Sequence, residues 1–410
     1  MTKSVAFGDL NYESLTELLR RDELNVAHEI DVFLSAIFWV KHDFRSREKF
    51  LPEVLKYVRF PLIAKPELVT IVNSEQFLQR NAISVNALPK IIESTRLQRI
   101  PQLKMPRTGP LETAIILSGG KSVSKHGLNN NLMAFLPLRD TWVTLPELHV
   151  PRHSHGAAVC QGSLYLIGGV SGSISSLPHV CRFCPVSNKW YCDVANLPHP
   201  VSCSAVVLLQ NKLFVIGGKD SCNTTLRKTQ CYDPLLNQWD CISDMNYPRD
   251  NHCATVLNDC IYVISGDKCN FRSCELYDSS TNKWFTLPEM TLPRQQPAAQ
   301  ALRGKVLVAG GFSGGNYRMH TTCEIYDPKN SEWSLLSGLT VPRAGCGIAC
   351  IGDYVYIFGG ANGRSVLNTL DSVECYNATD NEWKTVSVIP DTVVAPQVAV
   401  IRMPRKYLHH

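Results

Sequence analysis

The sequence predicts an α+β multidomain protein with two parts. An all-α segment is expected over residues 1–105, and an all-β propeller with six blades over residues 106–404. Two observations lead to this. Residues 1–100 carry apolar side chains at helical spacing, and the remainder repeats a pattern of paired glycines and tryptophans every 45–50 residues. A chain of 410 residues with 44% hydrophobic content is long and apolar enough to bury a sizeable core.

The first part reads as a set of amphipathic helices. The stretches NYESLTELLRRD and VAHEIDVFLSAIFWVKHD place apolar residues on single helical stripes, and SREKFLPEVLKYVRF and KPELVTIV continue the pattern. The stripe residues are Leu15, Leu18 and Leu19 in the first stretch, and Ile30, Phe33, Ile37 and Val40 in the second. We expect these helices to pack together through those stripes.

The second part is organised by glycine pairs and tryptophans. The pairs are Gly119 and Gly120, Gly168 and Gly169, Gly217 and Gly218, Gly310 and Gly311, and Gly359 and Gly360, with Ser265-Gly266 at the missing place. The tryptophans are Trp142, Trp190, Trp239, Trp284, Trp333 and Trp383, and a Phe or Tyr lies seven residues before each. Turns such as YDPLLNQW and YDSSTNKW separate the two aromatics, as between two short strands. Each unit therefore predicts four antiparallel strands.

The two ends of the repeat region complement each other. The first glycine pair lacks a proper strand of its own that follows a proline-arginine step, and the last apolar run, PQVAVIRM, has no glycine pair after it. We expect a C-terminal strand near residues 396–402 to complete the first blade and close the ring, because closure removes the open edges of the sheets.

These landmarks resemble the kelch repeat, and the order of the first hundred residues resembles the BACK domain of BTB-BACK-kelch proteins. The resemblance implies a substrate-recognition adaptor of a cullin-3 type ubiquitin ligase, with a target protein held by the propeller. It also implies a BTB domain before BACK. This sequence carries no segment that resembles a BTB domain, nor the first BACK helices. Delivery of the target to the ligase therefore stays an expectation. A decoy that binds the target without delivering it is an alternative. A second alternative is an actin-binding, cytoskeletal role.

The strings FVIGGKDS and ILSGGKSV raise the question of a phosphate-binding loop. Such a loop needs an earlier glycine and a Ser or Thr after the lysine. Ile115 occupies the glycine place in the first candidate, and Asp220 follows Lys219 in the second. The repetition of the pair in five units instead indicates a backbone that passes close to its neighbours.

One face of the propeller is the expected binding surface. In a four-stranded antiparallel blade, the loop after the second strand and the link from the fourth strand to the next blade lie on the same face, here called the rim. From each tryptophan to the next glycine pair the spacing is 26 or 27 residues, but from that pair to the next tryptophan it varies from 18 to 23. Variation in these loops favours a binding role for the rim.

The resemblance places partner contacts in these loops and just after the proline-arginine steps. The predicted rim residues are His153, Ser154, Asn251, Gln296, Tyr317, Arg318, Asn362 and Arg364, followed by Lys219, Arg227 and Arg272. Their cations and amides favour an acidic or polar segment of a target protein. In one link Val201 replaces the arginine, and Ser202 follows it at the expected rim position. The recurring Arg152, Arg249, Arg294 and Arg343 are interpreted as structural, with buried stems and guanidinium groups bonded to carbonyls. The six tryptophans are interpreted as core residues.

Other functions find little support. The net charge of +5 is too mild to indicate nucleic acid or membrane partners, and no cofactor is expected. Cys181 and Cys184 form a CxxC without the second pair that zinc needs, and the HxH of His153 and His155 is no stronger, so no metal site is expected. No constellation indicates catalysis, and we expect no enzyme. The N-terminus has no apolar core typical of an export signal, so cytoplasmic placement with sixteen reduced cysteines is expected.

Overall fold

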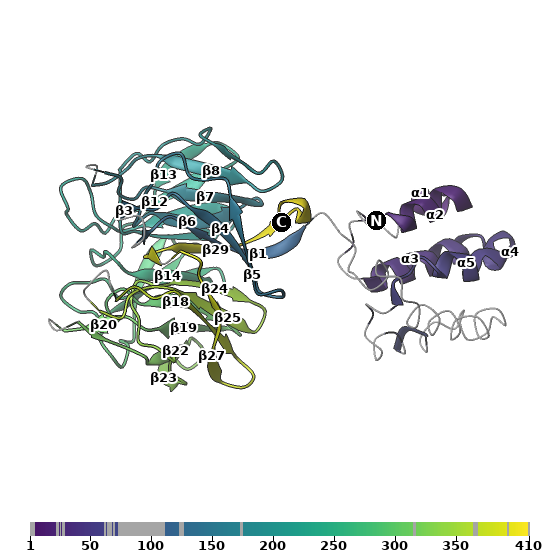
Figure 1. Cartoon of the computed structure of the whole chain (residues 1–410). Coiled ribbons are helices and arrows are strands. Elements are labelled where there is room, and N and C mark those ends of the chain that lie inside the picture. The colour runs from purple at the N-terminus through teal and green to yellow at the C-terminus, as the bar shows by residue number, and fades with distance from the viewer. Residues whose placement is uncertain are drawn as a thin grey trace. The chain divides into compact units, whose positions relative to one another are not determined.

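The computed structural model describes residues 5–21, 24, 26, 29–60, 63, 68, 70–72, 111–122, 127–172, 175–314, 317–363, 368–391 and 393–408. The chain divides into two compact units, one of residues 1–112 with 404–406 and one of residues 113–403 with 407–410 (Figure 1). The first is helical and the second is an all-β propeller, which confirms the predicted fold class. Half of KPELVTIV and all of residues 73–110 lie outside the described residues.

The helical unit is built from short amphipathic helices. They are α1 (Val5–Gly8), α2 (Tyr12–Arg20), α3 (Glu29–His42), α4 (Phe44–Arg47), the 3-10 turn η1 (Glu48–Phe50) and α5 (Leu51–Leu55). Helix α2 begins where the Asn11 side chain accepts a hydrogen bond from the Ser14 amide at 2.8 Å, a typical N-cap. Helix α5 begins with a proline in its first turn, where no amide partner is lost.

The predicted apolar stripes form the core of this unit. Leu15 and Leu19 of α2 pack with Ile30, Phe33, Ile37 and Val40 of α3, all of them buried. Leu18 is only half-buried. The Trp39 indole donates to the Leu10 carbonyl at 2.7 Å and lies under the Arg47 guanidinium, 4.3 Å from the ring centroid. A buried aromatic with a satisfied N–H ties the helices together.

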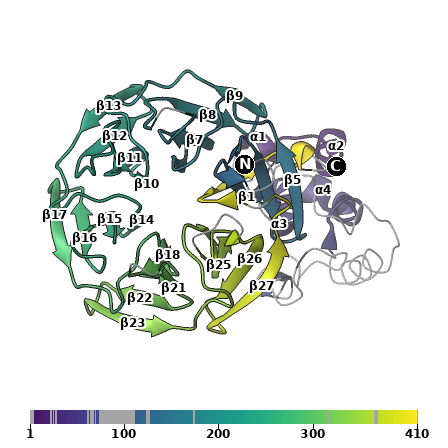
Figure 2. The ribbon, with the colours of Figure 1, turned by 60° about the vertical axis from the view of Figure 1, so that its left-hand side comes forward.

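Six four-stranded sheets form the propeller, and Figure 2 shows them arranged as a ring. Blade one has β29 (Gln397–Met403), β1 (Glu112–Ser118), β4 (Leu132–Leu136) and β5 (Thr141–Leu145). Blade two has β6 (Gly156–Cys160), β7 (Ser163–Ile167), β8 (Val180–Cys184) and β9 (Lys189–Tyr191). Blade three has β10 (Ala205–Leu209), β11 (Lys212–Ile216), β12 (Thr229–Asp233) and β13 (Gln238–Cys241).

The remaining blades repeat this plan. Blade four has β14 (Cys253–Leu257), β15 (Cys260–Ile264), β16 (Cys274–Asp278) and β17 (Lys283–Leu287). Blade five has β18 (Ala298–Leu302), β19 (Lys305–Ala309), β22 (Cys323–Asp327) and β23 (Glu332–Leu336). Blade six has β24 (Gly347–Ile351), β25 (Tyr354–Phe358), β26 (Ser372–Asn377) and β27 (Glu382–Val388). Short ribbons lie in the loops: β2 (Lys121–Ser122), β3 (Gly127–Leu128), β20 (Phe312–Ser313), β21 (Arg318–Met319) and β28 (Val393–Val394), and a 3-10 turn, η4 (Arg405–Tyr407), follows β29.

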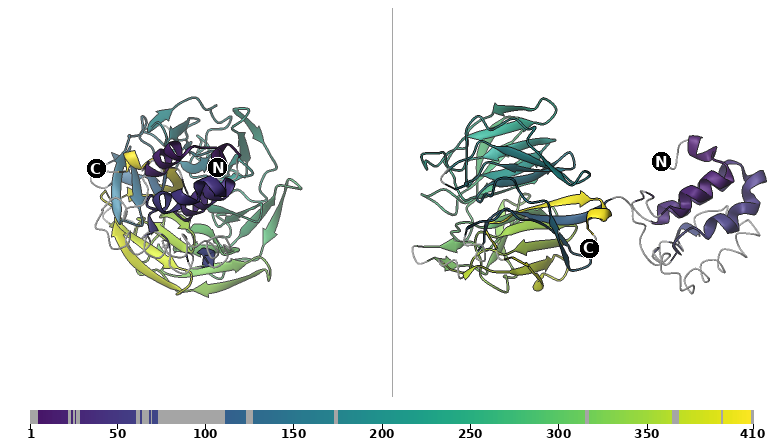
Figure 3. Two further views of the ribbon diagram at one scale, coloured as in Figure 1. Left: turned by 90° about the vertical axis from the view of Figure 1, so that its right-hand side faces the viewer. Right: turned by 45° about the horizontal axis from the view of Figure 1, so that its top comes forward.

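Blade one combines the two ends of the propeller sequence. Its order is β29-β1-β4-β5, so the C-terminal strand is hydrogen-bonded to the first strand of the region, and Figure 3 shows the yellow β29 beside the blue β1. Apolar residues of β29 and β1 share one core cluster with β7 of blade two, including Ile401, Ile116 and Leu166. Burial of this cluster fixes the register of blade one.

Each repeat tryptophan links its blade to the preceding one. Every indole packs against the Phe or Tyr seven residues earlier, with ring centroids 4.8–5.3 Å apart. Five of the indole N–H groups donate at 2.8–3.1 Å to carbonyls of the preceding blade, those of Pro146, Ala195, Ser243, Pro288 and Ser337. Only Trp284 and Trp383 are fully buried, and the other four are half-buried. The interpretation of all six as core residues is therefore too strong, because four lie at seams between blades.

The glycine pairs lie where the second strand of a blade meets the neighbouring link. Gly217 and Gly218 have φ of +57° and +93°, and a Cβ added there would lie 2.6 Å from the Arg249 carbonyl oxygen and 2.5 Å from that of Ser202. Glycine satisfies both constraints. In blade four Ser265 takes the first place with φ +68°, and its hydroxyl donates to the Arg294 carbonyl.

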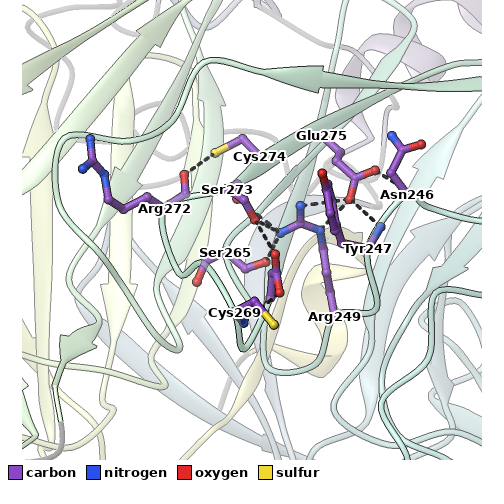
Figure 4. Close-up of polar contacts among 10 residues, drawn as sticks. Asn246, Tyr247, Arg249, Ser265, Cys269, Arg272, Ser273, Cys274 and Glu275 are labelled. Carbon is purple, nitrogen blue, oxygen red and sulfur yellow. Dashed lines mark hydrogen bonds and ion pairs between the residues drawn. The ribbon is translucent and has the colours of Figure 1, made fainter.

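The recurring arginines are buried and structural, as the sequence predicts. In blade four, Arg249 bonds the Ser265 and Ser273 carbonyls and pairs with Glu275, whose carboxylate also accepts the amides of Asn246 and Tyr247 (Figure 4). The pairs Arg294–Glu324 and Arg343–Glu374 repeat this arrangement in blades five and six, with all six side chains at 0% exposure. Hydrogen bonds to the carboxylate and to the guanidinium offset the cost of burying both charges.

Candidate partner-binding rim

A ring of six residues surrounds one end of the central channel. Each lies two positions after the arginine site of its blade and has a left-handed φ between +50° and +60°: Ser154, Cys203, Asn251, Gln296, Gly345 and Ala395. We call this set the mouth ring. Its members are joined through the backbone, since the Cys203 amide donates to the Ser154 carbonyl at 2.8 Å and the Asn251 amide to the Cys203 carbonyl at 3.0 Å. Gly345 and Ala395 continue this chain of bonds from Gln296, each at 3.0 Å.

The mouth ring lines a cavity of about 250 Å³. Below it, the innermost strands of the six blades line a second cavity of about 480 Å³ along the channel. The two cavities share six lining residues: Ser204, His252, Pro297, Cys346, Pro396 and Gln397. The side chains of the ring are uneven around the mouth. Ser154, Asn251 and Gln296 present hydroxyl and amide groups, whereas Gly345 and Ala395 present none. One side of the mouth is therefore lined by polar side chains, and the other side presents no polar side chain from the ring.

Two buried histidines lie beneath the mouth ring. Burial, together with the nearby positive charges of Arg152 and Arg249, lowers the pKa of His155 and of His252 to about 3. Both imidazoles are thus neutral at physiological pH. Within the described residues, His155 Nδ1, both ring nitrogens of His252 and the Ser204 hydroxyl have no hydrogen-bond partner. Unpartnered buried polar atoms carry a desolvation cost that a ligand group could relieve.

Four of the predicted rim residues meet at this cavity. His153, Ser154, Asn251 and Gln296 all line it, and all are half-buried. His153 pairs through its backbone with Val170, and its ring Nδ1 lies 2.9 Å from the Ser154 hydroxyl. The Asn251 amide donates to Asp250 Oδ1 at 2.7 Å. The backbone pairing of His153 with the residue after a glycine pair puts links and loops on the same face.

The predicted cations lie farther out, and three of them face carboxylates. Lys219 lies 3.9 Å from Asp250, Arg227 lies 3.5 Å from Asp244, and Arg272 lies 3.6 Å from Glu289. Arg318 is exposed on β21, beside Tyr317, whose ring stacks on Phe312 at 4.7 Å. Asn362 is exposed in the blade-six loop, and its amide donates to the Asn368 carbonyl. Arg364 lies outside the described residues.

Asp250 is the charged centre of the rim that the sequence did not single out. It is 7% exposed, accepts a hydrogen bond from Thr225 at 2.6 Å and lies 3.3 Å from Lys268. Burial acts to raise the pKa of Asp250, but the hydrogen bonds from Thr225 and Asn251 and the charges of Lys219 and Lys268 lower it overall. The carboxylate is therefore already neutralised by its own neighbours.

Sequence reasoning also missed Cys203, His155, His252 and Ser204. In the blade-three link the expected rim position was Ser202, which is 3% exposed and pairs with Lys219 through the backbone. The mouth position belongs to the next residue, Cys203. Counting two residues from Val201, as from the arginines, would have found it. His155 and His252 both lie three residues after the arginine, in PRHSH and PRDNH, and this recurrence could have found them.

In the described part of the chain, no group of three or more His, Cys, Asp or Glu side chains is placed to hold a metal ion. Cys181 and Cys184 are three residues apart on one strand, and Cys184 interacts with Ser187 instead. No helix among the described residues is long and apolar enough to cross a membrane.

The fold and the mouth define a repeat-type β-propeller with a polar opening. Comparison with known proteins agrees: the KLHDC2/KLHL20/DRC7 Kelch-repeats domain matches residues 110–288 and 205–400, and the BACK domain (BTB And C-terminal Kelch) matches residues 1–73. The chain belongs to the Kelch-repeat family, with a BACK segment before the propeller.

Similar proteins carry kelch names. Kelch-like protein 35 of Mus musculus is 28% identical over 319 residues, covering 65% of this chain and 54% of that protein. Kelch-like protein 25 of Xenopus tropicalis is 26% identical over 318 residues, covering 64% and 54%. The chain spans about half the length of these relatives. A solved structure, "Structure of YjhT", matches with a TM-score of 0.56 and 15% identity over 67% of this chain and 97% of that one, which shows the fold alone.

Proposed function

We propose that this chain is a non-enzymatic recognition protein whose mouth ring and surrounding rim loops bind a segment of a target protein. The observation that carries the proposal is the cavity of about 250 Å³ with polar ring residues above the neutral His155 and His252, three of whose four ring nitrogens have no hydrogen-bond partner among the described residues. A polar side chain inserted there can bond these free ring nitrogens without displacing a hydrogen bond within the protein. Loop variation around a rigid ring supports the same role.

The chemistry of the mouth favours a polar, uncharged contact at the centre. The rim cations Lys219, Arg227 and Arg272 already face carboxylates, so they offer little net positive charge to an acidic ligand. The ring amides of Asn251 and Gln296 can both donate and accept hydrogen bonds. We therefore narrow the sequence-based expectation of an acidic or polar segment to one with an amide or hydroxyl side chain at its tip. The exposed Arg318 side chain can pair with an acidic residue that flanks this tip in the target segment.

We further propose that the bound target is presented to a cullin-3 type ubiquitin ligase, as an adaptor of the BTB-BACK-kelch kind. Two findings support this step, the BACK match at residues 1–73 and relatives named as kelch-like proteins. In such an assembly the propeller supplies specificity, while the contact with the ligase comes from the part of the protein that precedes it. The alternative of a decoy differs only in this second step.

The test is a quantitative pull-down with the 410-residue chain and two variants. N251G/Q296G removes the two amides yet keeps the left-handed backbone, since Gly345 already occupies an equivalent place. K329A/N330A changes two exposed residues in the turn between β22 and β23 and is the matched control.

A partner recovered with the parent chain and K329A/N330A, but at least about tenfold weaker with N251G/Q296G, supports recognition at the mouth, a loss equal to about 1.4 kcal/mol. Equal recovery with all three refutes it. Recovery of cullin-3 in the same samples tests the ligase step separately: a mouth-dependent partner without cullin-3 supports the decoy.

A further inference from the structure

Blade two departs from the arginine–glutamate arrangement of blades four to six. The glutamate lies two residues before the repeat tyrosine on the third strand, and in blade two that place is taken by Cys181 of β8. The partner arginine is kept: Arg152 is 1% exposed, and its Nη2 lies 3.4 Å from Cys181 Sγ. Within the described residues, no carboxylate pairs with Arg152. A slot that holds an anion in three blades therefore holds a thiol in this one.

A second thiol lies opposite the first. Arg182 of β8 pairs with Tyr191 of β9, so the antiparallel register brings Cys192 directly across from Cys181. The two thiols lie close enough for Cys192 to raise the pKa of Cys181, and both act on the charge of the Arg152 guanidinium. Directly opposed residues of an antiparallel pair have Cα atoms about 4.5–5.5 Å apart. That spacing lies within the range of about 4.4–6.8 Å found for disulfides.

The pair is specific to blade two. The equivalent cross-strand positions of the other blades hold Met133 and Thr144, Gln230 and Cys241, Glu275 and Thr286, Glu324 and Leu335, and Glu374 and Thr385. Cys241 of blade three thus occupies the position equivalent to that of Cys192, and both are exposed. The residue opposite Cys241 is Gln230, which has an amide side chain and no thiol. All sixteen cysteines are free thiols in the structure. Blade three accordingly provides an internal control.

We propose that Cys181 and Cys192 are a modification site for peroxides, which convert the two thiols into a cross-strand disulfide. The exposed Cys192 thiolate attacks one oxygen of the peroxide, the O–O bond breaks, and the released oxygen leaves as water or an alcohol, which gives a sulfenic acid on Cys192. The Cys181 thiolate then attacks that sulfur. The S–S bond forms, the S–O bond breaks, and hydroxide leaves and is protonated to water. The two thiols lose two electrons and two protons, and the peroxide is reduced.

Arg152 has a role in the second step. Burial raises the pKa of Cys181, and the Arg152 guanidinium opposes that rise. A positive charge held beside the sulfur favours the thiolate that resolves the sulfenic acid. Arg152 is a positioning residue here, since it acts through the sulfur and does not touch the peroxide.

Arg152 connects the proposed disulfide to the mouth ring. The Arg152 Nη1 group donates to the carbonyls of Gly168 and His179 at 3.2 and 3.3 Å, and the next two residues are His153 and Ser154 of the rim. Once Cys181 is joined to Cys192, its sulfur is drawn toward β9 and away from the Arg152 guanidinium, which it contacts at 3.4 Å in the reduced chain. The guanidinium then loses this contact directly behind the rim, and we expect the blade-two link to loosen.

The experiment uses the whole reduced chain, treated with hydrogen peroxide and then with an alkylating reagent, followed by proteolysis and mass spectrometry. We expect a linked peptide pair containing Cys181 and Cys192 that disappears on reduction, while Cys241 remains alkylated. C192S should give no linked pair, and C241S should behave as the parent chain. Both serines replace exposed thiols, so folding is not at risk. Amide hydrogen exchange at His153 and Val170, whose backbones are paired, should rise at least about twofold in the oxidised parent chain and stay unchanged in C192S.

Three results overturn the proposal. Cys192 and Cys241 could react with peroxide at the same rate and end as separate sulfinic acids. Cys192 could link to a cysteine other than Cys181. The linked pair could also appear equally in peroxide-treated chain that has first been unfolded in urea, which would show that the folded register plays no part.

Discussion

The guanidinium of Arg294 and the carboxylate of Glu324 lie 2.8 Å apart with both side chains at 0% exposure, and each also holds backbone groups of blade five. The Glu324 carboxylate accepts the Thr291 amide at 2.7 Å, while Arg294 Nη1 donates to the Gly310 carbonyl at 2.7 Å. One ion pair thus ties the link from blade four to the third strand and the glycine pair of blade five. Breaking such a pair from one side leaves a buried charge unpaired.

We therefore expect R294V to destabilise the propeller by about 3–5 kcal/mol, because Glu324 keeps its charge without a partner. Blade three shows a tolerated alternative, with Val201 in the arginine place and Gln230, whose amide bonds the His199 backbone, in the glutamate place. The double variant R294V/E324Q should recover about 1–3 kcal/mol of that loss. Urea unfolding of the parent, both single variants and the double variant gives the coupling. If the destabilisations of the two single variants simply add in the double variant, the unpaired charge of Glu324 is not the cause of the loss.

The contrast between Arg294 and Glu324 also shows what the sequence can predict. The arginine was recognisable because it recurs after a proline at a fixed place, whereas the glutamate lies 30 residues later on an alternating strand where a charged residue is ordinarily solvated. Local period and landmark residues determine the fold class and the number of blades, so both were predictable. Side-chain partners across a blade depend on three-dimensional register, so they were not.

The same limit applies at the rim. Ser154, Asn251 and Gln296 follow arginines and were found from the sequence, but Cys203 was missed because Val201 removed the landmark and the position was placed one residue early. The rim cations Arg227 and Arg272 were visible, yet their carboxylates belong to the following link, and that pairing changes the charge offered to a ligand.

Trp383 is 4% exposed, packs on Tyr376 and donates to the Ser337 carbonyl at 3.1 Å. W383A should cost about 3–5 kcal/mol in the free energy of unfolding, because it empties a buried aromatic site. W383F retains most of the ring and should cost about 1 kcal/mol for the lost hydrogen bond. Half-buried Trp142, whose indole donates to Ser387 Oγ at 3.2 Å, is the comparison, and W142A should cost less than W383A. Chemical denaturation of the three variants decides the order.

Gly217 and Gly162 separate the effect of backbone conformation from that of space. Both have positive φ, +57° and +73°, but a Cβ on Gly162 meets nothing within 4 Å, whereas one on Gly217 would lie 2.6 Å from the Arg249 carbonyl. G162A should therefore cost about 1–2 kcal/mol for the left-handed backbone alone, and G217A should cost more because the link has to move.

Blade four suggests a third variant at the same position. Ser265 stands where Gly217 does in blade three and donates its hydroxyl to the corresponding carbonyl, that of Arg294. G217S should therefore be milder than G217A. The melting temperatures of the three variants test this order. Equal melting temperatures for G217A and G162A would show that the close approach of the Arg249 carbonyl to Gly217 does not matter.

The two buried histidines make stability depend on pH. His252 has a pKa of about 3 in the folded chain, compared with about 6.5 when exposed, because burial and the charge of Arg249 disfavour its protonated form. Between pH 6.5 and 3 the unfolded state therefore binds a proton that the folded state does not bind. Stability contributed in this way is complete above pH 6.5 and is lost as the pH falls from 6.5 toward 3, at about 1.4 kcal/mol per pH unit for each such histidine.

H252Q removes one of these groups and should flatten the slope of unfolding free energy between pH 6 and 4 by about 1.4 kcal/mol per pH unit. His155 continues to contribute, so a slope of the same sign remains. The control is H149Q, which replaces an exposed histidine and should leave the slope unchanged. Paired carboxylates such as Asp250 lose their contribution at lower pH in all three chains, so the difference between variants isolates the imidazole. Urea unfolding across this range gives the slopes, and parallel slopes for H252Q and the parent chain would mean that His252 is protonated within the fold.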